Sequence, residues 1–169
     1  MKNSVPARVR WAFDVLGIEP GDRVLEIGPG PGVAAALIAD RLVKGRLVAI
    51  DRSEVSVRRT FARSRHLVDA GRLDVIHSSL EDFDGRGWPF DKVFAINVNL
   101  FWVRDATAEL KRIAGWLAAG GAVFLFYEAP SSAKGREISD RVRPALRSAG
   151  FKVVIKKSNA ALAIIGRGR

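Results

Sequence analysis

Short apolar runs of strand length alternate with helix-like segments along almost the whole chain. Such alternation is typical of parallel strands joined by helices. The last two runs differ, because only a polar turn around Asn159 separates them and so short a link joins only antiparallel neighbours. The sequence therefore predicts an α/β fold: a doubly wound, mostly parallel, seven-stranded sheet with an antiparallel last strand and helices on both faces. The predicted strands are residues 23–27, 45–51, 72–79, 91–97, 120–128, 151–158 and 161–167, and the predicted helices are residues 6–17, 33–43, 54–70, 106–118 and 136–149.

The first predicted helix is amphipathic. Val9, Phe13 and Leu16 fall on one face, Ser4 is a candidate N-cap, and Gly17 closes the segment. A chain of 169 residues has the length of one ordinary domain. We therefore expect a single domain over residues 1–169, with residues 1–20 as a helical lead-in.

Composition limits the class of protein. The chain is 48% apolar and 27% charged, as in soluble globular proteins. It has no leader-like apolar segment and no run near the roughly 18 apolar residues that a membrane span needs, so we expect a cytoplasmic protein without membrane attachment. The absence of cysteine excludes disulfides and thiolate metal sites, and the sequence predicts no metal centre.

Positive charge is concentrated near the end of the chain. Of the net charge of +10, residues 134–169 carry +8 (10 basic minus 2 acidic residues) and residues 1–133 carry +2 (18 minus 16). Such a segment attracts nucleic acid or another anionic surface. The alternative is a solvated basic face that only maintains solubility.

A glycine-rich loop, EIGPGPG at residues 26–32, follows the first predicted strand, where open α/β sheets bind ligands. The G-x-G-x-x-G fingerprint of dinucleotide folds fails, because Val33 stands at the third glycine position. Pro29 and Pro31 have no N–H to give a phosphate, and Glu26 would place negative charge beside it. A ligand with a cationic amine and no phosphate avoids these objections.

At this loop the chain resembles the class I S-adenosylmethionine-dependent methyltransferases, whose first motif runs E-x-G-x-G-x-G after strand one. The resemblance extends to about Arg167 and includes LAAGG at residues 117–121, which is similar to the family's L-K-P-G-G turn. It implies that the methionine portion of S-adenosylmethionine lies along residues 26–32. It also implies that Asp51, which lies 19 residues after Gly32 (51 − 32), binds the ribose hydroxyls. The structural alternative for Asp51 is a charge at the start of the next helix.

The resemblance assigns the remaining cofactor contacts to the ends of the predicted strands. Ser79 occupies the position where the family often has an aspartate beside the adenine. The residues implied to bind the cofactor are Glu26, Gly28, Pro29, Gly30, Gly32, Asp51, Arg52, Ser53, Ser79, Leu80, Glu81, Asn97 and Val98.

The acceptor side is predicted after the fourth strand, where Asn99, Phe101 and Trp102 are candidates to bind substrate. Phe101 and Trp102 have an alternative role, which is to start the next helix and pack in the core. The [D/N/S]-P-P-[Y/F] motif of enzymes that methylate exocyclic amines is absent there, which disfavours that chemistry. No catalytic base is identified, and we expect structural or surface roles for His66 and His77.

The sequence thus predicts an S-adenosylmethionine-dependent methyltransferase that acts on a small molecule and releases S-adenosylhomocysteine. Two alternatives stay open: methylation of RNA or another anionic macromolecule, and a non-catalytic binding module with this fold. The chain lacks insertions that would form a substrate lid, apart from the first helix and residues 128–137. We therefore expect either an open pocket or closure by a second subunit in a homodimer.

Overall fold

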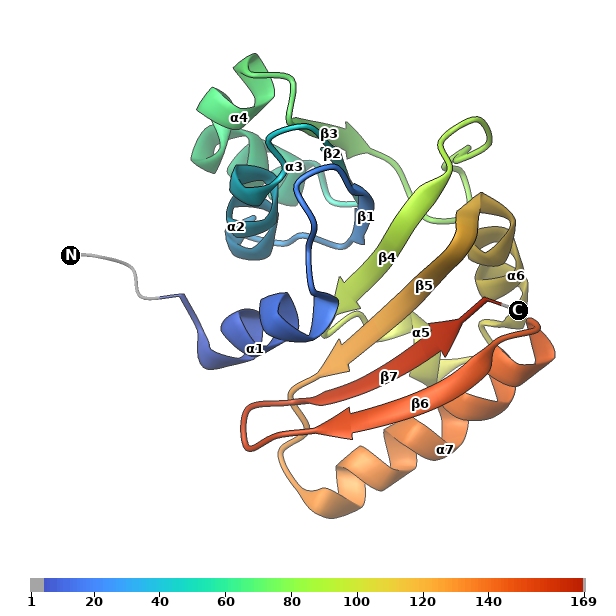
Figure 1. Ribbon diagram of the computed structural model, residues 1–169. Coiled ribbons are helices and arrows are strands. Elements are labelled where there is room, and N and C mark those ends of the chain that lie inside the picture. Colours follow the sequence, from blue (N-terminus) through green and yellow to red (C-terminus); the bar gives the residue numbers. More distant parts are fainter. Residues whose placement is uncertain (1–4, 169) are drawn as a thin grey trace.

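The computed structural model describes residues 5–168, which form a seven-stranded sheet with the order β3-β2-β1-β4-β5-β7-β6 (Figure 1). Strands β1 to β5 pair in parallel with one another, and β7 is antiparallel to both β5 and β6. The predicted fold class is therefore confirmed. The strands are β1 (Arg23–Ile27), β2 (Arg46–Asp51), β3 (Leu73–His77), β4 (Phe90–Ile96), β5 (Leu117–Tyr127), β6 (Lys152–Lys157) and β7 (Leu162–Arg167).

The link between β6 and β7 is the tight turn that the sequence predicts. Lys157 and Leu162 are register partners at its base. Inside the turn, the Ser158 hydroxyl accepts hydrogen bonds from the N–H groups of Ala160 and Ala161, at 3.0 and 3.1 Å. The side chain thus satisfies backbone donors that no strand partner can reach.

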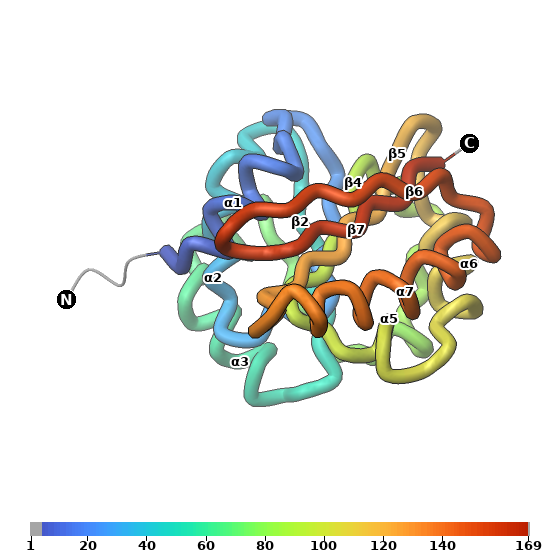
Figure 2. Tube along the Cα trace, turned by 90° about the horizontal axis from the view of Figure 1, so that it is seen from below, coloured from blue at the N-terminus to red at the C-terminus, as the bar shows by residue number. Residues whose placement is uncertain are grey.

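Helices cover both faces of the sheet (Figures 1 and 2). Helices α1, α2 and α4 pack into one buried apolar cluster, and α5, α6 and α7 pack into a second cluster on the opposite face. Figure 2 shows α7 running beneath the β6–β7 pair. The helices are α1 (Ala7–Leu16), α2 (Val33–Arg41), α3 (Glu54–Arg63), α4 (Arg65–Asp69), α5 (Leu100–Val103), α6 (Thr107–Trp116) and α7 (Ser132–Ser148).

Helix α1 lies along β5 on the first of these faces. Its residues Val9 and Leu16 are buried, and Trp11 contacts Phe126 of β5 edge-on, with ring centroids 5.9 Å apart. The helix ends at Gly17, as predicted, and this glycine adopts a left-handed conformation with φ 57°. Pro6 is its N-cap, and the candidate cap Ser4 lies outside the described residues.

Two predicted helices end differently from the sequence expectation. The helix predicted over residues 54–70 is broken at the buried Ser64, whose φ of −121° separates α3 from α4. Helix α2 stops at Arg41, two residues before the predicted end, and Gly45 has another role. Instead, a Cβ on Gly45 would lie 2.1 Å from the Asp22 carbonyl oxygen, and the position requires glycine for close backbone packing.

The segments before and after β5 also differ from the expectation. Strand β5 begins at Leu117, directly after α6, where the sequence suggested that the helix continues to Ala118. Helix α7 begins four residues earlier than predicted, because Ser131 caps it by accepting a hydrogen bond from the Lys134 N–H at 3.1 Å. Little of the segment proposed as a lid is therefore loop. Within residues 5–168 no helix is both long and apolar enough to cross a membrane.

Candidate functional site

The glycine loop joins β1 to α2 and places its three glycines in different surroundings. Gly28, Gly30 and Gly32 have φ values of 71°, 54° and 74°, which side chains disfavour. A Cβ on Gly28 would lie 2.8 Å from Val98 Cγ2, and one on Gly32 would lie 2.7 Å from Thr60 Cα. At Gly30 the same atom would meet nothing within 4 Å. Two glycines therefore permit packing within the protein, and the middle one borders open space.

Glu26 is the penultimate residue of β1 and is only 2% exposed. Its Oε2 atom has no hydrogen-bond partner among the described residues. Burial, and secondarily the negative charge of Asp51, raises the pKa of Glu26 to about 8. A cationic ligand would stabilise the ionised form of this buried carboxyl, because a nearby positive charge offsets the cost of its burial.

Asp51 ends β2 and ties the glycine loop to this strand. Its Oδ1 accepts a hydrogen bond from the Ser53 N–H at 2.8 Å, and its Oδ2 accepts one from the Gly30 N–H at 3.4 Å. Ser53, rather than Asp51, is the N-cap of α3, since its hydroxyl accepts from the Ser56 N–H. The capping role that was the alternative for Asp51 is thus filled by another residue. Arg52 is exposed, and its carbonyl oxygen lies 3.0 Å from His77 Nε2.

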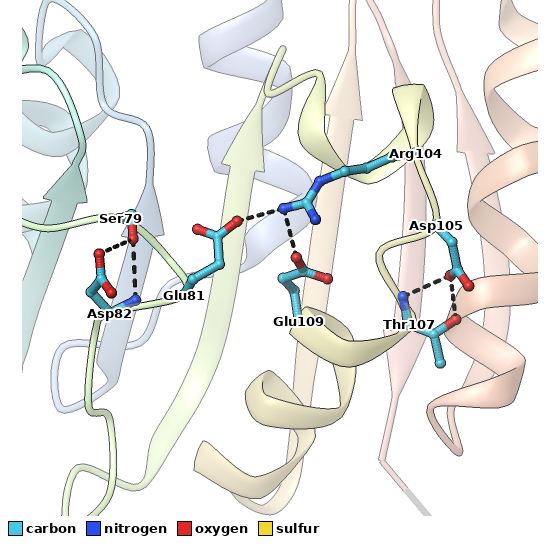
Figure 3. Close-up of polar contacts among 7 residues, drawn as sticks. All are labelled: Ser79, Glu81, Asp82, Arg104, Asp105, Thr107 and Glu109. Carbon is cyan, nitrogen blue, oxygen red and sulfur yellow. Dashed lines mark hydrogen bonds and ion pairs between the residues drawn. The ribbon is translucent and has the colours of Figure 1, made fainter.

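The loop after β3 points its predicted cofactor residues in different directions. The Ser79 hydroxyl donates to Asp82 Oδ2 at 2.7 Å and accepts from the Asp82 N–H at 3.1 Å, so it stabilises the turn (Figure 3). Leu80 is 4% exposed and packs in the core, so only its backbone is placed to meet a ligand. The carboxylate of Glu81 is paired with Arg104.

Arg104 connects the loop after β3 to α6. Figure 3 shows its guanidinium between Glu81 on one side and Glu109 on the other. The contact to Glu109 is 2.7 Å, and Glu109 is 4% exposed, with Oε2 unpartnered among the described residues. Sequence reasoning missed both residues. The available signal was a charged residue directly before Leu110 on the buried face of an amphipathic helix.

Hydrogen bonds hold the segment after β4, although Asn97 there adopts a disfavoured backbone conformation. Asn97 has φ 56°, its N–H donates to the Phe126 carbonyl at 2.8 Å, and its Oδ1 accepts from the Glu128 N–H at 2.8 Å. The Tyr127 hydroxyl donates to the Val98 carbonyl at 3.1 Å. These bonds lock the ends of β4 and β5 together, with Val98 against Gly28.

The three candidate acceptor residues separate in the structure. Phe101 is 1% exposed and packs in the core, as its structural alternative states. Trp102 is partly exposed, its Nε1–H donates to Asn99 Oδ1 at 3.2 Å, and Lys134 Nζ lies 4.2 Å from its ring centroid. Residues 100–103 form their own short helix, α5, and do not start α6. Asn99 is exposed at the start of α5.

Comparisons with known proteins agree with the resemblance to methyltransferases. The methyltransferase domain family matches residues 24–121. The chain is 32% identical over 112 residues to the uncharacterized methyltransferase YdaC of Bacillus subtilis, covering 66% of this chain and 59% of that protein. It is 31% identical over 150 residues to trans-aconitate 2-methyltransferase of Streptomyces coelicolor, covering 83% and 46%. The chain thus spans about half the length of these curated relatives.

A solved structure supports the fold. The SAM-dependent methyltransferase from Aquifex aeolicus superposes with a TM-score of 0.75 over 94% of this chain and 88% of that chain, at 15% sequence identity. At this level of identity the match concerns the fold.

Proposed function

Because the chain belongs to the methyltransferase domain family, we propose that it transfers the methyl group of S-adenosylmethionine to a small-molecule acceptor. The observation that carries the small-molecule part is a cavity of about 540 Å³ beside the end of β5. A cavity of this size is typical of small-ligand sites.

The cofactor side fits this proposal at two positions. The buried, unpartnered carboxyl of Glu26 suits the amino group of the cofactor's methionine portion. The open space at Gly30 leaves room for a ligand against the backbone of the loop. When bound, S-adenosylmethionine supplies a methyl group on a positively charged sulfur, which is an activated leaving group.

The chain's own contribution is then mostly alignment of the acceptor. Favourable alignment of reacting groups is worth up to roughly 7 to 11 kcal/mol. The hydrogen bonds of Asn97 to Glu128 and of Tyr127 to Val98 hold the ends of β4 and β5 together. We expect the acceptor to lie against this part of the protein. We therefore expect the rigidity of these two bonds to matter more than any general base.

The cavity adjoins these hydrogen bonds through Glu128, and its rim carries several polar residues. It lies between the start of α1, the segment from β5 to α7, and the β6–β7 turn. Arg8 of α1 pairs with Glu128 at 3.1 Å, which bridges the lead-in helix to the end of β5. The polar residues of this rim are Arg8, Glu128, Ser131, Ser132, Lys157, Ser158 and Asn159.

The polar rim supports a polar acceptor, and two of its residues, Arg8 and Lys157, suit an anionic group on that acceptor. The Streptomyces coelicolor relative acts, by its name, on trans-aconitate, a small carboxylate. This similarity supports small organic acids as the first acceptors to test.

The experiment is an acceptor-library screen that measures S-adenosylhomocysteine release, together with calorimetry of S-adenosylhomocysteine binding. We expect turnover with a small polar acceptor, and a raised KM in Arg8→Ala. Arg143→Ala in α7, outside the residues that line the cavity, serves as the matched control. Absence of S-adenosylhomocysteine binding would exclude the proposed methyltransferase activity. Binding without turnover on any small molecule would favour the non-catalytic module.

A second candidate acceptor is RNA. Its support is the excess of positive charge in residues 134–169. Turnover on RNA but on no small molecule would favour this candidate, whereas RNA binding without methylation would leave the small-molecule proposal intact.

A further inference from the structure

The basic residues of the last fifth of the chain divide between two opposite sides of the sheet. Arg136, Arg143 and Arg147 belong to α7. Val153 and Ile155 of β6 pack into the cluster that contains α7. Side chains alternate along a strand, so Lys152, Val154 and Lys156 project from the other face, the face covered by α1. Their register partners on β7 are Arg167, Ile165 and Ala163, respectively. We call Lys152, Lys156 and Arg167 the basic sheet face.

Two of these cations face each other directly. Lys152 is the register partner of Arg167 across the antiparallel pair. Arg167 is in turn level with Ala122 of β5, and Ala122 with Lys92 at the start of β4. Like charges directly opposite one another destabilise a sheet. The repulsion between Lys152 and Arg167 therefore costs stability, and a neutral side chain at either position would remove that cost.

No acidic side chain in residues 5–168 forms an ion pair with the basic sheet face. The nearby charges are already compensated. Lys92 is paired with Asp22, and Asp91 accepts the Arg23 N–H at 2.8 Å and lies 3.7 Å from its side chain. The three cations are exposed and therefore open to an external anion.

A groove of about 240 Å³ runs beside these cations. The end of α1 forms one wall through Val15 and Leu16, and Phe124 and Ile165 lie at its base. Lys156 and Arg167 line it on the side of β6 and β7. Asp91 and Lys92 also line the groove, and each is paired away from the basic sheet face, Asp91 with Arg23 and Lys92 with Asp22. The surface is thus concave, with unpaired positive charge along the side of β6 and β7.

We propose that the basic sheet face and this groove bind the phosphate backbone of single-stranded nucleic acid. Unpaired cations beside a groove are the arrangement that follows such a backbone. Phe124 is 5% exposed, so no base can stack on it, and we expect contacts to phosphates with little sequence preference. Lys152 and Arg167 are level with the start of β4, whereas the cofactor loop follows the end of β1. This binding therefore goes beyond methyl transfer and does not depend on it.

A lipid membrane fits the same surface less well. Among the described residues of β4, β5, β6 and β7, Val154 is the one large apolar side chain that is exposed, at 41%. Membrane docking normally inserts several apolar side chains beside the cations. A concave groove also matches a strand better than a flat bilayer.

The test measures binding by fluorescence anisotropy with a labelled, mixed-sequence RNA of about 16 nucleotides and with DNA of the same sequence, as salt is varied. We expect similar affinity for both, and three phosphate contacts predict a slope of log K against log salt of about −2. No binding of the intact protein even at low ionic strength would overturn the proposal. Equal competition by polyglutamate would also overturn it, in favour of an acidic protein partner.

Two triple variants separate this surface from net charge. Lys152→Gln/Lys156→Gln/Arg167→Gln removes three positive charges from the basic sheet face, and Arg136→Gln/Arg143→Gln/Arg147→Gln removes three from α7. We expect the first to weaken RNA binding by about 10-fold or more and to flatten the salt slope, and the second to leave the slope unchanged. Equal weakening in both would mean that only overall charge matters, and the proposal would fall.

Stability and cofactor binding provide the folding control. Removing one of two opposed cations relieves repulsion, so the Tm of Lys152→Gln should equal or exceed that of the original protein. S-adenosylhomocysteine binding should stay unchanged in all these variants. If the triple variant does not fold, Lys152→Gln alone still serves, and unaltered RNA affinity and salt slope in it would contradict the proposal.

Discussion

Two carboxyl side chains are buried within residues 5–168, and they differ in what compensates their charge. Glu26 at the end of β1 is 2% exposed and Glu109 in α6 is 4% exposed, and each has an oxygen without a partner among the described residues. Glu109 has a cation within the chain, because Arg104 reaches it at 2.7 Å. Glu26 has no such cation among the residues that the structure describes, and its pKa is raised to about 8.

The difference shows how a structural charge can be told from a binding charge. The Glu109–Arg104 pair is complete in the folded chain and joins α6 to the loop after β3. Glu26 costs folding free energy whenever it ionises, unless a ligand brings the positive charge. We infer that Glu109 holds the fold and that Glu26 belongs to the cofactor site.

The largest effect is expected on the pH dependence of stability. The folded-state pKa of Glu26, about 8, lies above the ordinary value of 4.5, so the folded protein binds a proton that the unfolded chain releases. Stability from this group is present below pH 4.5 and is lost as pH rises towards 8, by at most about 5 kcal/mol. Glu26→Gln should remove this loss. Denaturant unfolding at several pH values tests it, and parallel pH profiles of the two proteins would contradict it.

The second effect concerns the Arg104 pair. Arg104→Met leaves the buried Glu109 carboxylate without its cation, and we expect a loss of about 2–3 kcal/mol, because Arg104 itself is half exposed. The double variant Arg104→Met/Glu109→Gln should recover most of this loss. Urea unfolding measures both variants. If the double variant were as unstable as the single one, the pair would not be the cause.

A smaller effect separates the two carboxyls by binding. Glu26→Gln should weaken S-adenosylhomocysteine binding by about 10-fold, since a neutral amide replaces a charge-assisted contact to the amine. Glu109→Gln is the matched control, with a carboxyl of similar burial, and should leave the affinity unchanged. Calorimetry measures the affinity of both variants for S-adenosylhomocysteine. An equal loss of affinity in the two would contradict the assignment of Glu26 to the cofactor site and of Glu109 to the fold.

The smallest effect lies within the Glu26 site. Burial is the main cause of its raised pKa and the charge of Asp51 is the lesser cause. Asp51→Asn should therefore lower the pKa of Glu26 by less than about one unit. Carboxyl-labelled NMR titration of the protein without ligand measures the value. A return to an ordinary pKa would show that Asp51, and not burial, is the dominant cause.

The sheet could be predicted from the pattern of apolar runs and from the short β6–β7 link, because together they leave few strand topologies open. Helix ends were less predictable. The break at Ser64 and the end of α2 at Arg41 depend on tertiary packing that no local pattern contains. The predictions of a single domain and of a homodimer stay predictions.

In the site, sequence order located residues but not the directions of their side chains. Leu80 and Phe101 are themselves predicted site residues, yet their side chains lie in the core. The tie from Arg104 to Glu81 and Glu109 joins separate segments, so no single motif could reveal it. The pocket beside Glu128 likewise forms only when α1 folds back along β5.

The three environments in the glycine loop affect how tolerance to substitution should be interpreted. In a mutational scan Gly28, Gly30 and Gly32 would all appear intolerant, and all three would be read as ligand contacts. Alanine at Gly28 or Gly32 collides with Val98 or Thr60 and would reduce protein abundance as well as activity. Alanine at Gly30 meets no such obstacle, although its backbone angle is still disfavoured. Abundance and activity scores compared position by position would therefore assign the cofactor path to the middle glycine.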